Sequence, residues 1–332
     1  MSLKRINLHT LGAAAAASAS LTLMRILELP EIRRALAFPD IITRMREAVI
    51  AYSRGECDMP MPMHLAIAPV DAEVHIKSSY RRGGKYFALK IAATFPRNLA
   101  RGLPAGNGMM LLSSAETGEP VAFLADSGYL TDVRTAAVSA LVAGELGRRD
   151  QALGILGTGI QARLQARMHA EILDLHQIFL WGRDPQRAAE CRADLLAALP
   201  QTEICLARSL ADVAAAARLI VTATASRLPL LRAADLAAGT HISAVGADSP
   251  GKQELASDIL RRASLLLVDS RRQCAMLGEL QHAPDQAARA IEIGEFCDAP
   301  AAFDSAGITV ADFTGLGVED LYIAESCYLG AL

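Results

Sequence analysis

Apolar residues early in the chain recur with the period of a helix and then change to the alternation of strands. Over residues 39–53 they stand three and four positions apart, which predicts an amphipathic helix. The following segments alternate or run apolar and are separated by Gly, Pro and Asp turns, which predicts strands. We expect these strands at residues 61–67, 73–79, 86–92, 109–112 and 121–124. The first part of the chain is therefore predicted to form a mainly antiparallel sheet.

Residues 129–146 form a long alanine-rich helical pattern, with Thr131 or Asp132 able to cap it. Beyond this helix, short apolar strands alternate with helical segments. Such alternation predicts an α/β fold of the Rossmann type, with a doubly wound parallel sheet beside a smaller α+β domain. The strands are expected at residues 152–156, 177–181, 203–206, 219–222, 241–245 and 265–269.

The same patterns divide the chain into three parts. Residues 1–23 contain an alanine run after Lys4 and Arg5 but are interrupted by polar residues, so we interpret them as an extension outside the folded domains rather than a signal peptide. The smaller domain is predicted to comprise residues 24–138 together with 312–332, and the Rossmann domain residues 139–311. The run at 308–313 and a last helix at 318–327 follow, and the sequence allows them to return to the smaller domain.

Composition narrows the classes of function. With 52% apolar residues over 332 positions, both domains can bury a core, and the formal charge of −3 indicates neither a nucleic-acid groove nor a membrane surface. The six cysteines include no Cys-x-x-Cys pair, which favours reduced thiols, a cytoplasmic location and no zinc site. We therefore expect a small-molecule ligand and no metal.

One glycine motif carries the first chemical signal. The predicted strand at 152–156 is followed by Gly157-Thr158-Gly159-Ile160-Gln161-Ala162, which opens a helix. Glycines in this context let the backbone approach a dinucleotide pyrophosphate, which the helix N-terminus binds. The alternative is a glycine turn that only joins strand to helix.

The end of the next strand bears on cofactor choice. Gly182 stands where NAD-binding proteins place an acid for the ribose, and Arg183 follows it. This pair leaves room for a 2′-phosphate and offers a guanidinium to bind it, so NADP(H) is favoured over NAD(H). Alternatively Arg183 is solvated, and Asp184 caps the next helix or binds the ribose.

Three motifs, at residues 130–137, 157–162 and 245–255, are similar to those of the ornithine cyclodeaminase and mu-crystallin family. This family also holds alanine dehydrogenases, ketimine reductases and hydroxyproline dehydratases. The resemblance implies a homodimer joined through the amino-terminal domain, with an amino or imino acid between that domain and the nicotinamide. Further cofactor contacts are expected from Thr135, Arg187, Thr222, Thr224 and Val245.

The resemblance also implies the catalytic set. Lys90 and Arg134 match the residues that bind the substrate carboxylate, and Asp248 matches the catalytic aspartate, with Lys90 also counted as catalytic. Fixed cations orient the carboxylate, and an aspartate with a tuned pKa exchanges protons with the amine or imine. Without the resemblance, Lys90 and Arg134 read as surface residues, and Asp248 as a turn residue.

Two departures from the family pattern bear on the substrate. Residues 59–64 lack the family's usual arginine, and Lys77 stands where the cyclodeaminase offers a glutamate to ornithine. Lys77 is thus a substrate-binding candidate that disfavours a second ammonium. Among the remaining residues, Met59, Met61 and Met63 are expected to pack in the core rather than bind copper, and His64 and His75 to be structural.

These observations predict an ornithine cyclodeaminase-like, NAD(P)-dependent enzyme that transfers hydride at the α-carbon of a small L-amino acid or its cyclic imine. An NADPH-dependent ketimine reductase or alanine dehydrogenase uses the same residues and remains open, as does a hydroxyproline dehydratase. A mu-crystallin-like binding protein is the alternative from another class.

Overall fold

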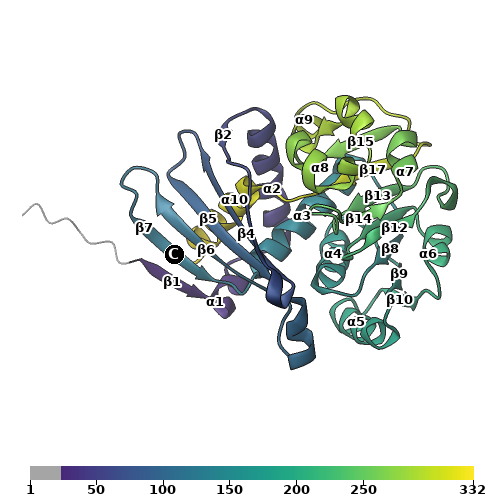
Figure 1. Cartoon of the computed structure of the whole chain (residues 1–332), viewed down its shortest axis with the longest axis horizontal. Helices are drawn as coiled ribbons and strands as arrows, with labels where there is room; N and C mark the ends of the chain where they lie inside the picture. The colour runs from purple at the N-terminus through teal and green to yellow at the C-terminus, as the bar shows by residue number, and fades with distance from the viewer. Residues whose placement is uncertain (1–23) are drawn as a thin grey trace, which may run out of the picture.

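The computed structural model describes residues 24–332, so the prediction for residues 1–23 lies outside the described residues. The described chain forms two units, each built on its own sheet, which stand side by side in Figure 1. The α/β class with a second, mixed-sheet unit is confirmed. No helix within residues 24–332 is long and apolar enough to cross a membrane.

The first unit contains a seven-stranded sheet in the order β1-β7-β6-β5-β4-β2, with β3 paired to β4. Strands β2 to β7 pair antiparallel, as their alternation predicted. The unpredicted β1 runs parallel to β7. The bounds are β1 (Arg25–Glu28), β2 (Cys57–Asp58), β3 (Met63–Ile67), β4 (Ala72–Arg81), β5 (Tyr86–Thr94), β6 (Gly106–Ser114) and β7 (Pro120–Ala125).

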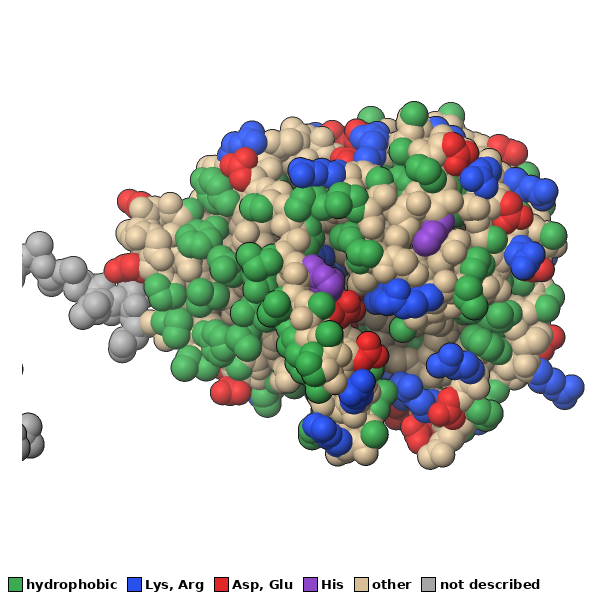
Figure 2. All heavy atoms as spheres, in the orientation of Figure 1, with side chains coloured by type: hydrophobic (Ala, Val, Ile, Leu, Met, Phe, Trp, Pro, Cys, Tyr) green, Lys and Arg blue, Asp and Glu red, His purple; other side chains and the backbone are tan. Residues whose placement is uncertain are grey.

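Helices cover one face of this sheet and leave the other bare. The helices of this unit are α1 (Leu29–Arg34), α2 (Phe38–Ser53), α3 (Tyr129–Glu145) and α10 (Gly317–Gly330), and α10 packs on β4, β5 and β6. The opposite face exposes large apolar side chains, which gather over the strands in Figure 2. We call Met63, Leu65, Leu89, Ile91 and Met109 the apolar sheet face. The prediction that Met63 packs in the core is wrong, since 63% of it is exposed and no helix within residues 24–332 covers this side.

The second unit is a sheet of eight parallel strands in the order β10-β9-β8-β11-β13-β17-β15-β16. Its strands are β8 (Ala152–Leu156), β9 (Gln177–Trp181), β10 (Glu203–Leu206), β11 (Leu219–Thr222), β13 (His241–Ala244), β15 (Leu265–Val268), β16 (Ile291–Glu292) and β17 (Thr309–Asp312), and β12 (Arg227–Leu231) pairs with β14 (Gln253–Leu255) beside it. Its helices are α4 (Ile160–Ala170), α5 (Pro185–Ala198), α6 (Leu210–Ala216), α7 (Ser257–Arg262), α8 (Arg271–Leu277) and α9 (Ile293–Asp298).

The last segment of the chain divides between the two units. The run at residues 308–313, for which a return to the smaller domain was open, forms β17, which lies between β13 and β15 in the parallel sheet. Only α10 crosses back and packs on the mixed sheet, as Figure 1 shows in yellow. The loop between β17 and α10 therefore runs directly from one unit to the other.

The start of α3 is held differently from the prediction. Gly128 is its N-cap, with φ +87°, and the Asp126 carboxylate accepts a hydrogen bond of 2.8 Å from the Leu130 backbone. The prediction that Thr131 or Asp132 caps this helix is therefore wrong. Both residues lie inside the first turn, which leaves them free to line the space between the two units.

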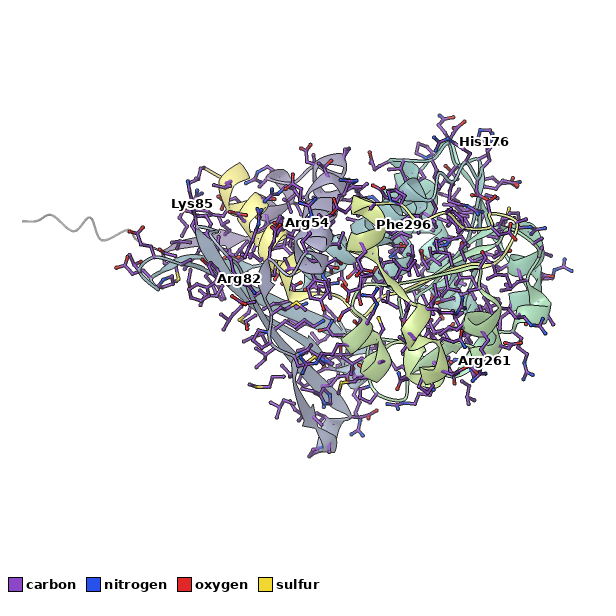
Figure 3. The ribbon with its side chains drawn as sticks, turned by 90° about the horizontal axis from the view of Figure 1, so that it is seen from above. Arg54, Arg82, Lys85, His176, Arg261 and Phe296 are labelled. Atoms are coloured by element: carbon purple, nitrogen blue, oxygen red, sulfur yellow. The ribbon has the colours of Figure 1, made fainter. Side chains whose placement is uncertain are left out.

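The two units meet along helices and leave a cleft beside the sheet edges. Arg54 at the end of α2 pairs with Asp298 of α9 at 2.6 Å, and Figure 3 places Arg54 and Phe296 near this junction. In the parallel sheet, crossovers change direction between β8 and β11, which is where doubly wound folds bind ligands. The loops after β8, β11, β13 and β17 open at this edge.

Candidate active site

The glycine motif has the backbone that a dinucleotide requires. Gly157 adopts φ +128°, and a Cβ there would lie 2.4 Å from the Ala223 carbonyl oxygen, so only glycine fits. Beside Gly159, in contrast, nothing lies within 4 Å of an added Cβ, which leaves open space before the N-terminus of α4. Free N–H groups at that terminus favour an anion. The loop therefore fits a pyrophosphate.

The residues predicted at the ribose end lie at the surface after β9. An added Cβ at Gly182 would lie 2.3 Å from the Thr158 methyl, so a larger residue at this strand end would collide with Thr158. Asp184 caps α5, since its carboxylate accepts hydrogen bonds from Gln186 N at 2.9 Å and Arg187 N at 3.3 Å. Arg183 is exposed and, within residues 24–332, has no side-chain hydrogen bond or ion pair. Its guanidinium is thus available to a ligand.

Thr222 and Thr224 are engaged by a buried glutamate that the sequence did not single out. Glu254 accepts hydrogen bonds from the Thr222 hydroxyl at 2.6 Å and from the Thr224 hydroxyl at 2.7 Å. It also accepts from the Gly246 backbone at 2.9 Å. Glu254 therefore joins the loops after β11 and β13. Thr222 is fully buried, and its hydroxyl is engaged by Glu254.

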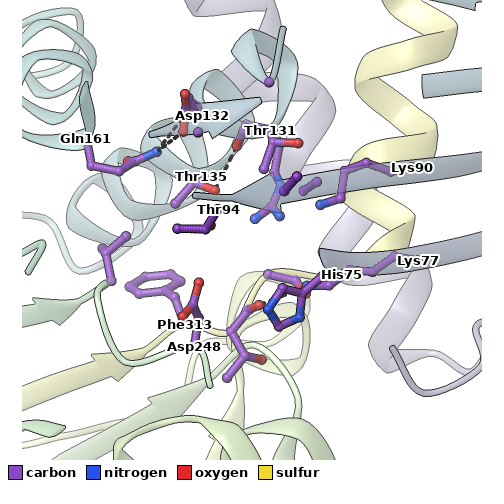
Figure 4. A pocket seen from close by; sticks show the side chains of 18 of the residues that line it. His75, Lys77, Lys90, Thr94, Thr131, Asp132, Thr135, Gln161, Asp248 and Phe313 are labelled. Atoms are coloured by element: carbon purple, nitrogen blue, oxygen red, sulfur yellow. Dashed lines mark hydrogen bonds between the residues drawn. The ribbon is translucent and has the colours of Figure 1, made fainter. Parts of the chain in front are cut away.

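A cavity of about 210 Å³ lies between the two units and brings most of the predicted substrate residues together. We call it the cleft cavity (Figure 4). Figure 4 shows Lys77 and Lys90 reaching it from the mixed sheet, with Asp248 and Phe313 on the opposite side. Its charged and polar lining comprises Glu73, His75, Lys77, Lys90, Thr94, Asn107, Thr131, Asp132, Arg134, Thr135, Gln161, Asp248 and Thr314, and Val245 also lines it.

Lys90 and Arg134 form the buried floor of this cavity, and both pair with the start of α10. Lys90 Nζ lies 2.8 Å from the Asp320 carboxylate, and Arg134 Nε donates to the same group at 3.1 Å. Arg134 also pairs with Glu319 at 3.0 Å. Burial lowers the pKa of Lys90 to about 7 and raises the pKa of Glu319 to about 7. Both groups therefore titrate near neutral pH, and an added carboxylate in the cavity would favour the charged form of Lys90.

Lys77 lies beside Lys90, its cross-strand partner, but is held by another part of the chain. Its ammonium donates to the carbonyl oxygens of Thr314 at 3.0 Å and Gly315 at 2.6 Å. The buried Asp269 carboxylate fixes this loop by accepting from both backbone N–H groups, at 2.6 Å and 2.5 Å. These two bonds fix the Lys77 side chain in the wall of the cavity, where burial lowers the pKa of its ammonium.

Asp248 follows β13 and faces this floor from the parallel-sheet unit. Its carboxylate lies 2.6 Å from Lys252 Nζ and accepts a hydrogen bond from Ser249 Oγ at 3.1 Å. Enclosure raises the pKa of Asp248, but the Lys252 ammonium outweighs this and holds the pKa below its usual range. Asp248 is thus ionised at neutral pH and able to accept a proton.

Comparison with known proteins agrees with this arrangement. The family described as ornithine cyclodeaminase/mu-crystallin matches residues 24–331. The chain belongs to this family. The uncharacterized cyclodeaminase y4tK of Sinorhizobium fredii is 38% identical over 278 residues, which are 81% of this chain and 84% of the relative. The iminosuccinate reductase of Paracoccus denitrificans is 31% identical over 79% of this chain and 82% of its own. An archaeal alanine dehydrogenase dimer with bound NAD has a TM-score of 0.84 at 26% identity, over 93% of this chain and 96% of that one.

In this family member, several site residues escaped the sequence analysis. The sequence feature that could have pointed to Glu319 and Asp320 is that they are two adjacent acidic residues within an apolar helical run. Asp132 was considered only as a cap, yet it lines the cavity and accepts a hydrogen bond of 3.2 Å from Gln161 in α4. Burial raises the pKa of Asp132 to about 6, so it titrates near neutral pH beside the glycine motif. Gly315 left no signal at all.

We expect Gly315→Ala to weaken substrate binding in this family member. Gly315 has φ +75°, and a Cβ there would lie 2.4 Å from Arg134 Nη1, so the guanidinium must move. Displacement of the Arg134 guanidinium and backbone strain at residue 315 together predict a KM increase of about tenfold or more. Gly147→Ala is the matched control, because Gly147 has φ +66° but open space around it. Equal KM values for the two variants would contradict this role of Gly315.

Proposed function

We propose that this chain is an NAD(P)-dependent enzyme acting at the α-carbon of a small L-amino acid or of its cyclic imine. The observation that carries the proposal is one cavity that joins a cationic floor, Lys90 and Arg134, to the ionised Asp248 beside the glycine-motif helix. The family relatives support it, since they are named as a cyclodeaminase, an imine reductase and an alanine dehydrogenase.

The floor residues would bind the substrate carboxylate. Arg134 offers a planar guanidinium and Lys90 a point charge, and both are held in place by Asp320. An incoming anion favours the charged form of Lys90, so binding offsets the pKa depression that burial causes. The substrate is thereby oriented with its α-carbon toward the glycine-motif side of the cavity, where Gln161 lies.

Asp248 would act as the acid–base group. Its ionised carboxylate accepts a proton from the substrate amine and returns one to the imine in the reverse direction. A bound nicotinamide supplies the hydride chemistry at the α-carbon. Lys252 keeps Asp248 ionised before the substrate binds.

Lys77 favours net oxidation or reduction over cyclisation. Its ammonium is fixed in the cavity wall by two carbonyl oxygens, so a second substrate ammonium nearby would meet a like charge. A substrate with a neutral or acidic side chain, or a cyclic imino acid, avoids this repulsion. Ornithine cyclodeamination is the second candidate, and the Asp248 loop, which matches the family motif over residues 245–255, favours it.

A substrate panel separates these candidates. Purified protein is tested at 340 nm with NADH and NADPH against cyclic imines of proline and pipecolate and against pyruvate with ammonia. L-Ornithine and trans-3-hydroxyproline are tested with NAD+ and NADP+, because cyclodeamination begins by hydride transfer to the oxidised cofactor. We expect steady consumption of reduced cofactor with a cyclic imine or an imino acid. Proline and ammonia formed from ornithine without net consumption would establish the cyclodeaminase instead. Cofactor binding without turnover of any of these compounds would contradict the proposal and identify a carrier.

We further propose that NADP(H) is preferred. Gly182 stands at the end of β9, where an acidic residue would bind the ribose of NAD. Asp184 is engaged in capping α5, and the guanidinium of Arg183 is exposed. Arg183→Ala is expected to weaken NADPH binding by about tenfold to a hundredfold, the effect of losing a charged hydrogen bond, and to leave NADH binding nearly unchanged. Affinities follow from nicotinamide fluorescence, with the exposed Arg261→Ala as control. Equal losses for both cofactors would contradict this preference.

The apolar sheet face supports a homodimer, which we propose as the working assembly. Ile91 and Met109 are cross-strand neighbours, and both side chains are exposed on it. Ile91→Asp is expected to yield monomers at concentrations where the wild type is a dimer, because a charge in a self-associating apolar face must be desolvated. Light scattering after size exclusion measures the assembly state, with Leu228→Asp on β12, an exposed apolar position outside the apolar sheet face, as control. Dimers of undiminished affinity in Ile91→Asp would contradict the proposed interface.

A further inference from the structure

A second group of potential ligands stands at the margin of the cleft cavity and takes no part in the proposed reaction. His64 on β3 and His75 on β4 are direct cross-strand partners, and Glu73 lies two residues before His75 on the same side of β4. His64 Nε2 lies 3.4 Å from Glu73 Oε2, and His75 Nε2 lies 3.7 Å from the same oxygen. The strand register therefore brings two imidazoles and one carboxylate together.

These two distances are close to the separation between neighbouring ligand atoms in a tetrahedral metal site. Bonds of about 2.0–2.2 Å from zinc to nitrogen and oxygen place neighbouring ligand atoms roughly 3.3–3.5 Å apart. The three ligand atoms here all lie within 4.8 Å of one another. Among residues 24–332, neither imidazole has a hydrogen bond other than its contact with Glu73. The His64 side chain is also 43% exposed, so a small rotation can complete the set.

The charged groups around Glu73 also favour the binding of a metal ion. One carboxylate oxygen, Oε2, faces the two imidazoles, while the other, Oε1, lies 3.9 Å from Lys252 Nζ. The carboxylate thus faces imidazole nitrogens through one oxygen and an ammonium through the other. Glu73 can therefore give one oxygen to a metal and keep the other for Lys252.

We propose that His64, Glu73 and His75 bind a divalent transition-metal ion of the zinc class at the edge of the cleft cavity. Two neutral imidazoles and a carboxylate are a ligand set that Zn²⁺ prefers, and three protein ligands leave a fourth position for water or a solute. Glu73 and His75 line the cavity, so that position opens toward it. No second carboxylate orients the imidazoles within the described residues, so we expect reversible, micromolar binding. The site does not depend on the proposed reaction.

Zinc titration of the full chain tests this site. After chelator treatment, calorimetry with Zn²⁺ is expected to show one equivalent bound per chain. His64→Ala and Glu73→Gln are each expected to weaken that binding by at least about tenfold. His176→Ala is the matched control, because His176 also lies near an acid, Asp174 at 3.3 Å, but sits at the outer edge of the second unit (Figure 3).

His64 and His176 are exposed and Glu73 is half-buried, so circular dichroism is used to verify that each variant folds. Loss of binding in both site variants with retention in His176→Ala supports the site. Absence of one-to-one binding in the wild type would overturn it. Zinc binding that persists in His64→Ala and Glu73→Gln would also overturn it and would point to the thiols, such as the half-buried Cys57 and Cys205.

Discussion

Asp248→Asn is expected to lower kcat/KM by about 10²–10⁴-fold while leaving cofactor affinity unchanged, because the amide retains the shape of the side chain but cannot accept a proton. The loss should appear in kcat, since we propose that Lys90 and Arg134, and not Asp248, hold the carboxylate of the substrate. Steady-state kinetics with the best substrate of the panel, together with nicotinamide fluorescence for cofactor binding, measure both quantities.

The control for this variant is an aspartate with a similar ion pair outside the cavity. Asp285 is exposed and pairs with Arg261 at 3.1 Å, so Asp285→Asn should leave kcat/KM at the wild-type value. If Asp248→Asn retained activity within threefold of the wild type, the acid–base role would pass to another titrating group in the cavity. Asp132 is the next candidate, because its pKa of about 6 lies near neutral pH.

Asp320→Asn is expected to lower the free energy of unfolding by about 3–5 kcal/mol, the usual effect of breaking a buried ion pair. Asp320 is 2% exposed and contacts both Lys90 and Arg134, which are equally buried. Removing its charge leaves Lys90 without an anionic partner and Arg134 with only Glu319, which is partly protonated at neutral pH. Urea denaturation at pH 7 measures the change.

Two further variants make this prediction specific. Glu319→Gln should cost less than Asp320→Asn, because the pKa of Glu319 is about 7 and its wild-type form is already partly neutral. The double variant Lys90→Met with Asp320→Asn should recover part of the lost stability, since it removes the stranded cation together with its partner. The single variant Lys90→Met is measured as well. If its loss of unfolding free energy and that of Asp320→Asn simply add in the double variant, Lys90 and Asp320 do not stabilise each other.

The sequence by itself determined the parallel-sheet unit and the glycine motif, whereas the main charged residues were singled out through the resemblance to the family. Six of the eight parallel strands were predicted because each is a short apolar run bounded by helical segments, and this signal is local. Gly157 was recognisable because a strand, a glycine turn and a helix must follow one another directly in the chain. Asp248 was placed at the sheet edge because it immediately follows a predicted strand.

Only the tertiary structure decided how these residues are partnered. The pairing of Lys90 and Arg134 with Asp320 depends on α10 returning to the mixed sheet, and β17 enters the parallel sheet between strands that precede it in the chain. Strand register decided that His64, Glu73 and His75 converge and that Met63 faces outward. These are contacts between segments distant in sequence, so no local periodicity encodes them, and a one-residue change of register would reverse every side chain on a strand.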